Sequence, residues 1–288
     1  MKYLVTAIAI LGLAFSINSC SQNSNAYSSS LWGGKKVVGS KNYVKKNIKV
    51  DNFEGISVAG SPDVTYTQKS GNPSVEVYTS DNIIDLLDIR VKDNMLYIGF
   101  KKNTSVSYNK LEIKITSGNL SNISVAGSGS IRLANGVKTT NGLTVNIAGS
   151  GSAYGENLKC SSFAAYIAGS GGIKAKNIAC DKLKTSIAGS GDLSLQDIKT
   201  IDTECSISGS GTAILTGSAQ NATYSISGSG DLKASDCEVS NISASISGSG
   251  DIKCHATEFL KARSSGSGTI GYKGNPKVDY PAKSLYRL

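Results

Sequence analysis

The stretch that decides the fold is residues 162–191, SFAAYIAGSGGIKAKNIACDKLKTSIAGSG, in which a 20-residue segment is followed by a close copy of its own beginning. The tripeptide Gly-Ser-Gly occurs eight times, starting at Gly127, Gly149, Gly169, Gly189, Gly209, Gly228, Gly248 and Gly266. The successive spacings are 22, 20, 20, 20, 19, 20 and 18 residues, and a degenerate copy starts at Gly60. A nearly constant period of this length indicates a repeat architecture.

Apolar side chains alternate with small or polar ones inside each copy. Two residues before the first glycine stands Val or Ile in seven of the eight copies, and Ser264 takes this place in the last one. A second alternating segment follows each tripeptide and includes Ile131, Ile173 and Leu193. Such alternation is typical of half-buried strands. Each copy therefore predicts two strands joined at a glycine corner, where glycine adopts backbone conformations barred to other residues.

A unit of about 20 residues cannot bury its own apolar edge, but stacked copies bury a continuous column. The sequence therefore predicts an all-β fold, a single-chain parallel β-solenoid (a β-helix) of about 20-residue coils. The crossover rule for parallel strands favours a right-handed path. Equivalent residues of successive coils should then form ladders with a spacing of about 4.8 Å.

The segment before the repeats has longer and more highly charged strands, and we expect it to continue the stack irregularly and close its N-terminal end. Asp-Asn pairs at 81–82 and 93–94 predict turns, and residues 82–87 predict the one short helix. The expected organisation is a lipoprotein signal peptide (1–19), a flexible tether (20–30), the N-terminal strand-rich part (31–120), the Gly-Ser-Gly solenoid (121–272) and a C-terminal cap or tail (273–288).

The first residues predict export and a membrane anchor. Lys2 precedes a short apolar run, residues 3–17, which fits a secretory signal better than a span of about 20 apolar residues. The run ends just before Cys20, which the polar stretch SQNSNAYSSS follows. This arrangement resembles a bacterial lipoprotein signal, and the resemblance implies that Cys20 becomes the acylated N-terminus. The alternative is an ordinary signal peptide cut nearby, which would leave a free thiol.

Five cysteines remain after Cys20, and we expect them to pack as small buried hydrophobes. Cys160 and Cys180 each lie eleven residues after the first glycine of their copy, so they should occupy adjacent coils. Strand spacing makes a disulfide between these two residues geometrically possible, and the compartment of an exported protein is oxidising.

Outward residues at the corners invite two further hypotheses. The central serines of the tripeptides should form an exposed ladder. This ladder could bind a glycan or order water, or serine could stand there simply because it is a small polar residue that suits a tight, solvated corner. Asp192, Asp231 and Asp251 follow a tripeptide and suggest calcium, but Ca²⁺ needs six to eight oxygens and these carboxylates should be stacked. The sequence therefore predicts no metal site and no cofactor.

Composition argues against several function classes. The only histidine is His255, so chemistry built on clustered histidines is excluded, and no serine nucleophile has a neighbouring base. The net charge of +9 has no aromatic-plus-basic motif beside it, so nucleic acid is not an expected partner. A polysaccharide-active β-helix enzyme would need converging carboxylates, which stacked repeats do not supply.

The strings Ser-Val-Ala-Gly-Ser at 57–61 and 124–128, and Ile-Ala-Gly-Ser-Gly at 167–171, resemble a bacterial family named auto-transporter adhesin, head GIN domain. The resemblance covers about residues 45–272 and implies an exported solenoid without catalytic residues. We therefore expect a non-catalytic, lipid-anchored outer-membrane protein, facing the periplasm or the cell surface, that binds a glycan or a protein partner. The alternatives are an envelope scaffold with a fixed protein partner and a polysaccharide-active enzyme.

Overall fold

The computed structural model describes residues 36–279 and 284–288, which belong to one compact unit, Lys35–Leu288. Within the described residues the chain is built of strands and one helical turn, α1 (Asp81–Ile84), which lies where the sequence predicts the short helix. No helix among these residues is long and apolar enough to cross a membrane.

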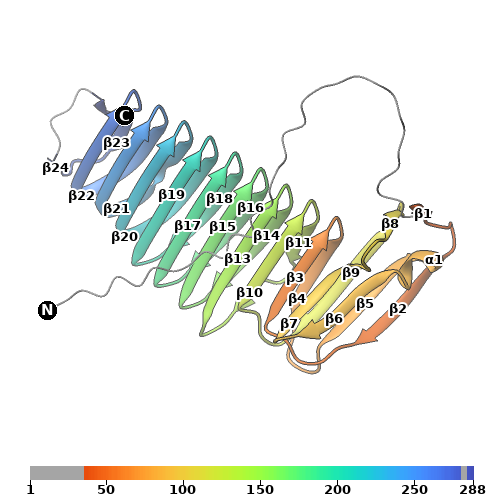
Figure 1. The fold of residues 1–288 in the computed structure, drawn as a ribbon. Coiled ribbons are helices and arrows are strands. Elements are labelled where there is room, and N and C mark those ends of the chain that lie inside the picture. Colours follow the sequence, from red (N-terminus) through yellow and green to blue (C-terminus); the bar gives the residue numbers. More distant parts are fainter. Residues whose placement is uncertain (1–35, 280–283) are drawn as a thin grey trace, which may run out of the picture. The chain divides into compact units, whose positions relative to one another are not determined.

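The repeats form a parallel β-solenoid, as predicted, with two strands and a glycine corner in each regular coil (Figure 1). Strands that lead into a corner are β3 (Gly55–Gly60), β10 (Asn122–Gly127), β13 (Gly142–Gly149), β15 (Ser162–Gly169), β17 (Lys182–Gly189) and β19 (Asp202–Gly209). Strands that leave a corner are β4 (Asp63–Gln68), β11 (Ser130–Leu133), β12 (Val137–Lys138), β14 (Ser152–Lys159), β16 (Gly172–Ala179) and β18 (Asp192–Lys199). In the last coils the two kinds merge into the long strands β20 (Thr212–Gly228), β21 (Asp231–Gly248) and β22 (Asp251–Gly266), followed by β23 (Ile270–Lys273).

The strands that lead into the corners pair from coil to coil without a shift of register, whereas the strands that leave the corners carry register shifts after Leu195, Ile214 and Ala234. Gly169 of β15 faces Gly149 of β13 on one side and Gly189 of β17 on the other, so all corners stack in one line. The degenerate copy belongs to the same column, because Gly60 of β3 faces Gly127 of β10. The ladder of Val and Ile before each corner is buried throughout, as the two-residue period predicts: Val58, Val125, Ile147, Ile167, Ile187, Ile207, Ile226 and Ile246.

Both glycines of the corner are required by geometry. Gly189 has a φ of +124°, and a Cβ built there would lie 2.5 Å from the Gly169 oxygen of the preceding coil. Gly191 has no room for a side chain, because its Cβ would lie 2.5 Å from Cγ2 of Ile167. The glycine excess of the sequence is therefore a consequence of backbones that approach one another at every corner.

A second corner, which the sequence analysis did not anticipate, interrupts the strands that leave the glycine corner. Asn157, Asn177 and Asp197 hold left-handed φ values of 57°, 55° and 53°, and Gly136, with a φ of 81°, takes this place in the preceding coil. In the following coil Gly217, with a φ of 126°, faces Ile198 across a register shift. Asn, Asp and Gly are the residues that adopt this conformation most readily. The signal was present, because these residues recur eight or nine residues after the first glycine of their copy.

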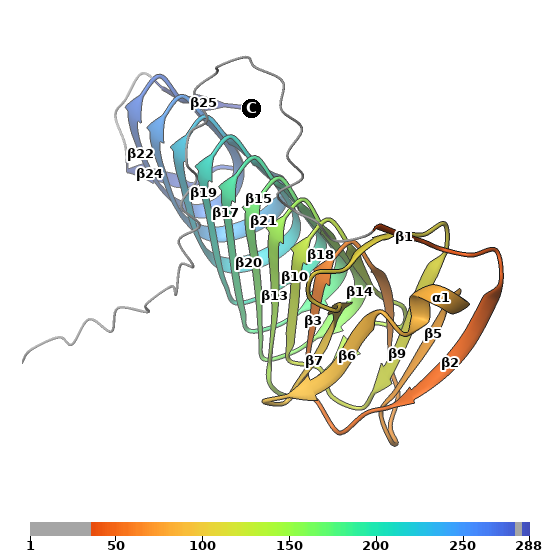
Figure 2. The same ribbon diagram turned by 45° about the vertical axis from the view of Figure 1, so that its right-hand side comes forward.

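The N-terminal end differs from a simple continuation of the stack. β7 (Met95–Phe100) and β9 (Leu111–Ser117) pair in parallel with β3 and β4 and so extend the column. The strands beyond them are antiparallel: β5 (Ser74–Ser80) on β9, β2 (Tyr43–Lys49) on β5, and β6 (Leu87–Lys92) on β7 (Figure 2). A separate parallel pair joins β1 (Lys36–Val38) to β8 (Ser105–Ser107).

Local chemistry explains this reversal of strand direction. Asp93 and Asn94, at one of the predicted turns, both have positive φ values (50° and 62°), as in the type I′ turn of a two-residue hairpin. The hairpin therefore places β6 antiparallel to β7, whereas the coils of the solenoid pair with one another in parallel. At the other end of the stack, β24 (Lys277–Asp279) and β25 (Leu285–Arg287) pair with β22 and β23 and cover the last coil.

Candidate binding surface

The serines of the corners form the exposed ladder that the sequence predicts. All eight are exposed along one edge of the stack: Ser128, Ser150, Ser170, Ser190, Ser210, Ser229, Ser249 and Ser267. Their backbone N–H groups donate to the preceding coil, as Ser170 N does to the Gly149 oxygen at 2.9 Å. The ladder is thus an ordered polar edge whose backbone is already satisfied.

The corner aspartates also stack instead of converging. Asp231 faces Asp251 in register, and Asp251 Oδ1 accepts hydrogen bonds from the backbone N–H and the hydroxyl of Thr269 at 2.9 and 2.6 Å. The carboxylate of Asp251 therefore links its coil to the next one. Among residues 36–279 and 284–288, no three His, Cys, Asp or Glu side chains gather into a group that could hold a metal ion.

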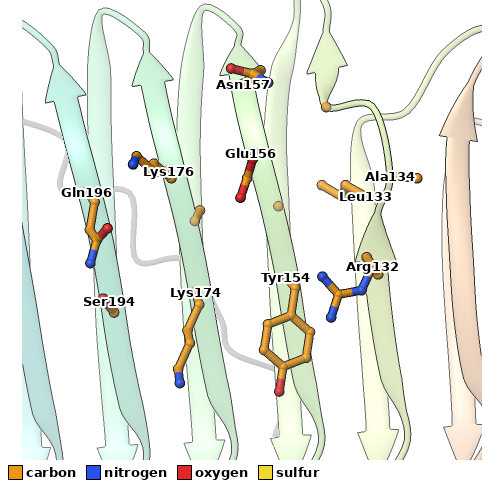
Figure 3. A pocket seen from close by; sticks show the side chains of 13 residues that line it. Arg132, Leu133, Ala134, Tyr154, Glu156, Asn157, Lys174, Lys176, Ser194 and Gln196 are labelled. Carbon is orange, nitrogen blue, oxygen red and sulfur yellow. The ribbon is translucent and has the colours of Figure 1, made fainter.

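The outer face of the strands that leave the corner carries a hollow of about 420 Å³ over β11, β14, β16 and β18 (Figure 3). Two breaks in the repeat lie at this hollow. Gly155 stands where the other coils place an inward side chain, and the 22-residue first coil replaces a regular strand with a turn at 134–136. Leu133 and Ala175 contribute apolar surface, and the outward side chains of the four strands surround it.

An aromatic ring and several charges lie together in this hollow. The guanidinium carbon of Arg132 is 5.1 Å from the ring centre of Tyr154, and Lys174 flanks Tyr154 in register on the other side. Lys176 forms an ion pair with Asp197 at 3.7 Å. Among the described residues, no ion pair engages Arg132, Lys174 or Glu156.

Polar groups for hydrogen bonding complete the lining. Asn157 Oδ1 accepts from the Asn177 amide at 3.0 Å, which fixes its side chain, and Ser194 and Gln196 lie on the next strand, β18. A second hollow of about 370 Å³ lies over the strands that lead into the corner, but there the Lys184 ammonium and the Glu204 carboxylate satisfy each other at 2.9 Å. The hollow around Tyr154 is therefore the better candidate for a binding site.

The structure tests the cysteine predictions only in part. Cys20 lies outside the described residues. Cys160 and Cys180 are buried on adjacent coils, where the Cys160 N–H donates to the Ala179 oxygen at 3.1 Å. Burial, reinforced by the Cys180 thiol, raises the pKa of Cys160 to about 12, and burial also raises the pKa of Cys180. Both are free thiols here, and the disulfide that the coil spacing makes geometrically possible stays the alternative to be tested.

The remaining three cysteines are buried in the column, which for Cys205 and Cys254 the two-residue period predicts. Burial raises the pKa of Cys205 and Cys237 to about 11 and that of Cys254 to about 12. They lie near the buried Tyr224, whose hydroxyl pKa burial also raises. These thiols are protonated at neutral pH and act as core side chains.

Stacked parallel coils, each in contact only with its neighbours, define the class of β-solenoid proteins. The family described as "Putative auto-transporter adhesin, head GIN domain" matches residues 52–213 and 166–276, and the chain belongs to this family. The resemblance of the repeated strings to this family is thus confirmed. No curated protein matches the chain.

Several solved structures are similar over most of the chain. A putative lipid binding protein from Parabacteroides distasonis is 29% identical, with 88% of this chain and 100% of that chain covered and a TM-score of 0.67. A putative adhesin from Parabacteroides merdae is 28% identical, with 88% and 99% covered and a TM-score of 0.68. A putative adhesin from Bacteroides fragilis is 29% identical, with 87% and 95% covered and a TM-score of 0.51.

Proposed function

We propose that this protein is a non-catalytic, lipid-anchored protein of the cell envelope whose solenoid presents a rigid surface for adhesion. The observation that carries the proposal is the family match over residues 52–276, together with structural neighbours whose names include adhesin. These support an adhesion or binding role for a protein associated with the envelope. The in-register ladders give this role a physical basis, because they hold outward side chains at fixed spacing on a stiff scaffold.

Two features of the chemistry favour binding over catalysis. The corner carboxylates are stacked along the ladder, and Asp251 is bonded to the next coil through Thr269. His255, the single histidine, faces Lys273 and Glu238 on neighbouring strands and has no cysteine or serine nucleophile among these register partners. Catalysis requires convergent groups within hydrogen-bonding reach of one reacting atom.

The lipid anchor at Cys20 rests on its place at the end of the apolar run, residues 3–17. Replacing the thiol by a hydroxyl removes the acceptor for the acyl group, and a single change then converts an anchored protein into a released one. In cells fed a clickable palmitate analogue, the wild-type chain should be labelled and sediment with membranes. Cys20→Ser should be unlabelled and soluble, and equal labelling of both would overturn the assignment.

Adhesion is tested with the purified full chain on beads, applied to surfaces coated with mucin, mixed glycans or envelope extract. Beads that carry the chain should be retained above beads that carry albumin. Protease treatment of intact cells should also remove the protein, since adhesion to other surfaces needs the solenoid outside the cell. Protection from protease together with no retention on any surface would refute the proposal.

A further inference from the structure

The hollow around Tyr154 is the place where the outer face of the solenoid departs from its own repeat. A Cβ built at Gly155 would lie 3.0 Å from Cδ1 of Leu133 and 3.5 Å from Cδ2 of Leu158, so these side chains fill the space beside the glycine, and Leu133 reaches the lining of the hollow. Gly136, with a φ of +81°, lets the turn of the first coil approach β14, where a Cβ would lie 2.5 Å from the Asn157 oxygen. Close contacts at both glycines therefore leave no room for a larger residue at either position in the lining of the hollow.

Tyr154 gives this hollow a flat aromatic platform. In the following coils the residues in register with Tyr154 are Lys174, Ser194, Ile214 and Lys233, and none of these is aromatic. In Figure 3 the ring is seen face-on between Arg132 and Lys174, and it is half-buried. An aromatic face set in a shallow, open hollow suits a ligand with a flat apolar face, such as the C–H face of a sugar ring.

The positive charges beside Tyr154 favour one kind of sugar over others. Arg132 and Lys174 lie on either side of the Tyr154 ring, and no carboxylate of the described residues forms an ion pair with either cation. Lys176 is different, because it is held by Asp197 at 3.7 Å. Arg132 also makes a cation–π contact with the Tyr154 ring, but neither cation has a carboxylate partner in the described part of the chain, so together they favour an anionic group on the ligand, since a charge-assisted hydrogen bond is about twice as strong as a neutral one.

The other end of the hollow suits hydroxyl groups. Glu156 follows two residues after Tyr154 on β14, beside Asn157, and Figure 3 shows its carboxylate between these two residues. Gln196 and Ser194 on β18 add amide and hydroxyl groups to the lining. Vicinal hydroxyls need donors and acceptors together, and this set supplies both.

We propose that the hollow over β11, β14, β16 and β18 is a binding site for an acidic sugar, a pyranose ring that carries a carboxylate. The sugar ring packs on Tyr154, the carboxylate lies between Arg132 and Lys174, and hydroxyls reach Glu156 and Gln196. This inference rests on the proposed adhesive function and names its ligand class. A simple phosphate would use the cations but leave the ring and the Glu156 carboxylate without a role.

The experiment is saturation-transfer difference NMR of the full chain in mild detergent with glucuronic acid, N-acetylneuraminic acid and glucose, each titrated for Kd. Comparing the two acidic sugars shows whether the site prefers a uronic acid or a sialic acid, both of which carry a carboxylate on a pyranose ring. At least one should show transfer to its ring protons, with glucose weaker by about tenfold or more. Equal binding of glucose, or no binding of either acid, would overturn the proposal. Full displacement of the acid by inorganic phosphate at equal concentration would also overturn it.

Matched variants locate the site. Tyr154→Ala should raise Kd for the acidic sugar by about tenfold or more, whereas Tyr166→Ala, on β15 of the other strand set, should leave it unchanged. Lys174→Gln should reduce the preference for acid over glucose, whereas Lys233→Gln, at the same ladder position on β21, should not. Lys174 and Lys233 are exposed, so these two variants keep the test valid if Tyr154→Ala loses its fold.

The outcome separates this inference from the adhesive function. If the wild-type chain and Tyr154→Ala adhere equally to coated surfaces and neither binds an acidic sugar, adhesion stands and the site is wrong. If the wild-type chain binds the acidic sugar through Tyr154 but adheres to no surface, the site stands and the adhesive role is wrong.

Discussion

Replacing Gly189 by alanine tests whether the glycine corners hold the solenoid together. The residue has a φ of +124°, and an added Cβ would lie 2.5 Å from the Gly169 oxygen, a contact that no side-chain rotation relieves. The strained backbone costs about 1–3 kcal/mol, and the shift needed to relieve the clash adds about 1–3 kcal/mol. Gly189→Ala should therefore lower the free energy of unfolding by about 2–6 kcal/mol.

Gly172 offers a matched control on the neighbouring corner. Its φ lies outside the left-handed region, and its Cβ would meet the nearest atom, the Asp192 oxygen, at 3.6 Å, an ordinary contact. Gly172→Ala should be neutral or stabilise the protein by about 0.4–1 kcal/mol, because alanine restricts the unfolded chain.

The assay is thermal and urea unfolding of both variants and of the wild-type chain, followed by far-ultraviolet circular dichroism. In a unit of this size, 1 kcal/mol corresponds to about 2–4 °C, so Gly189→Ala should lower Tm by at least about 4 °C. If the two variants destabilise the protein equally, the requirement for glycine does not come from corner geometry. A Gly189→Ala variant as stable as the wild type would refute the reasoning outright.

Three further predictions follow from burial and charge. Unfolded without reductant, the chain from residue 21 onward should label at five thiols, and a count of three would instead show one disulfide, which peptide mapping would assign to Cys160–Cys180 or to another pair. Folded at pH 8, all five thiols should resist alkylation because burial raises their pKa. Ile187→Ala should destabilise by about 2–5 kcal/mol in urea unfolding, since it opens a cavity in a fully buried ladder, and a loss below about 1 kcal/mol would contradict that placement. The hydrogen bond from Lys45 lowers the carboxyl pKa of Glu76 in the folded protein, so this pair stabilises the fold fully above the pKa of the unfolded state and loses its effect as pH falls through the pKa of the folded state. Glu76→Gln should therefore reduce the fall of Tm at acid pH, and an unchanged fall would show that the Glu76–Lys45 pair does not contribute to stability.

The sequence was sufficient to predict the repeated part of the fold, because each coil repeats the same local information. Ile147, Ile167 and Ile187 are buried, and Ser150 and Ser170 are exposed, as a two-residue period with a glycine corner requires. Parallel stacking followed from the inability of a 20-residue unit to bury its own edge. Even the second corner, at Asn157 and its equivalents, left a periodic signal in the sequence.

The candidate site was beyond sequence reasoning for a physical reason. Gly155 was recognisable as an inward position without a side chain, but the hollow depends on how the 22-residue first coil lies beside the 20-residue coils that follow it. Arg132 and Tyr154 are 22 residues apart, and their contact exists only because β11 and β14 pair in register. Register between unequal coils is a property of the packed stack.

The sequence by itself determined that this protein is a stack of glycine-cornered coils and which side chains face inward, because these features repeat at a fixed spacing. Only the tertiary structure decided how the N-terminal end closes, since the antiparallel pairing of β2, β5 and β9 joins segments without a common period. It also decided where the outer face is hollowed, because a site formed where repeats differ depends on their packing against each other.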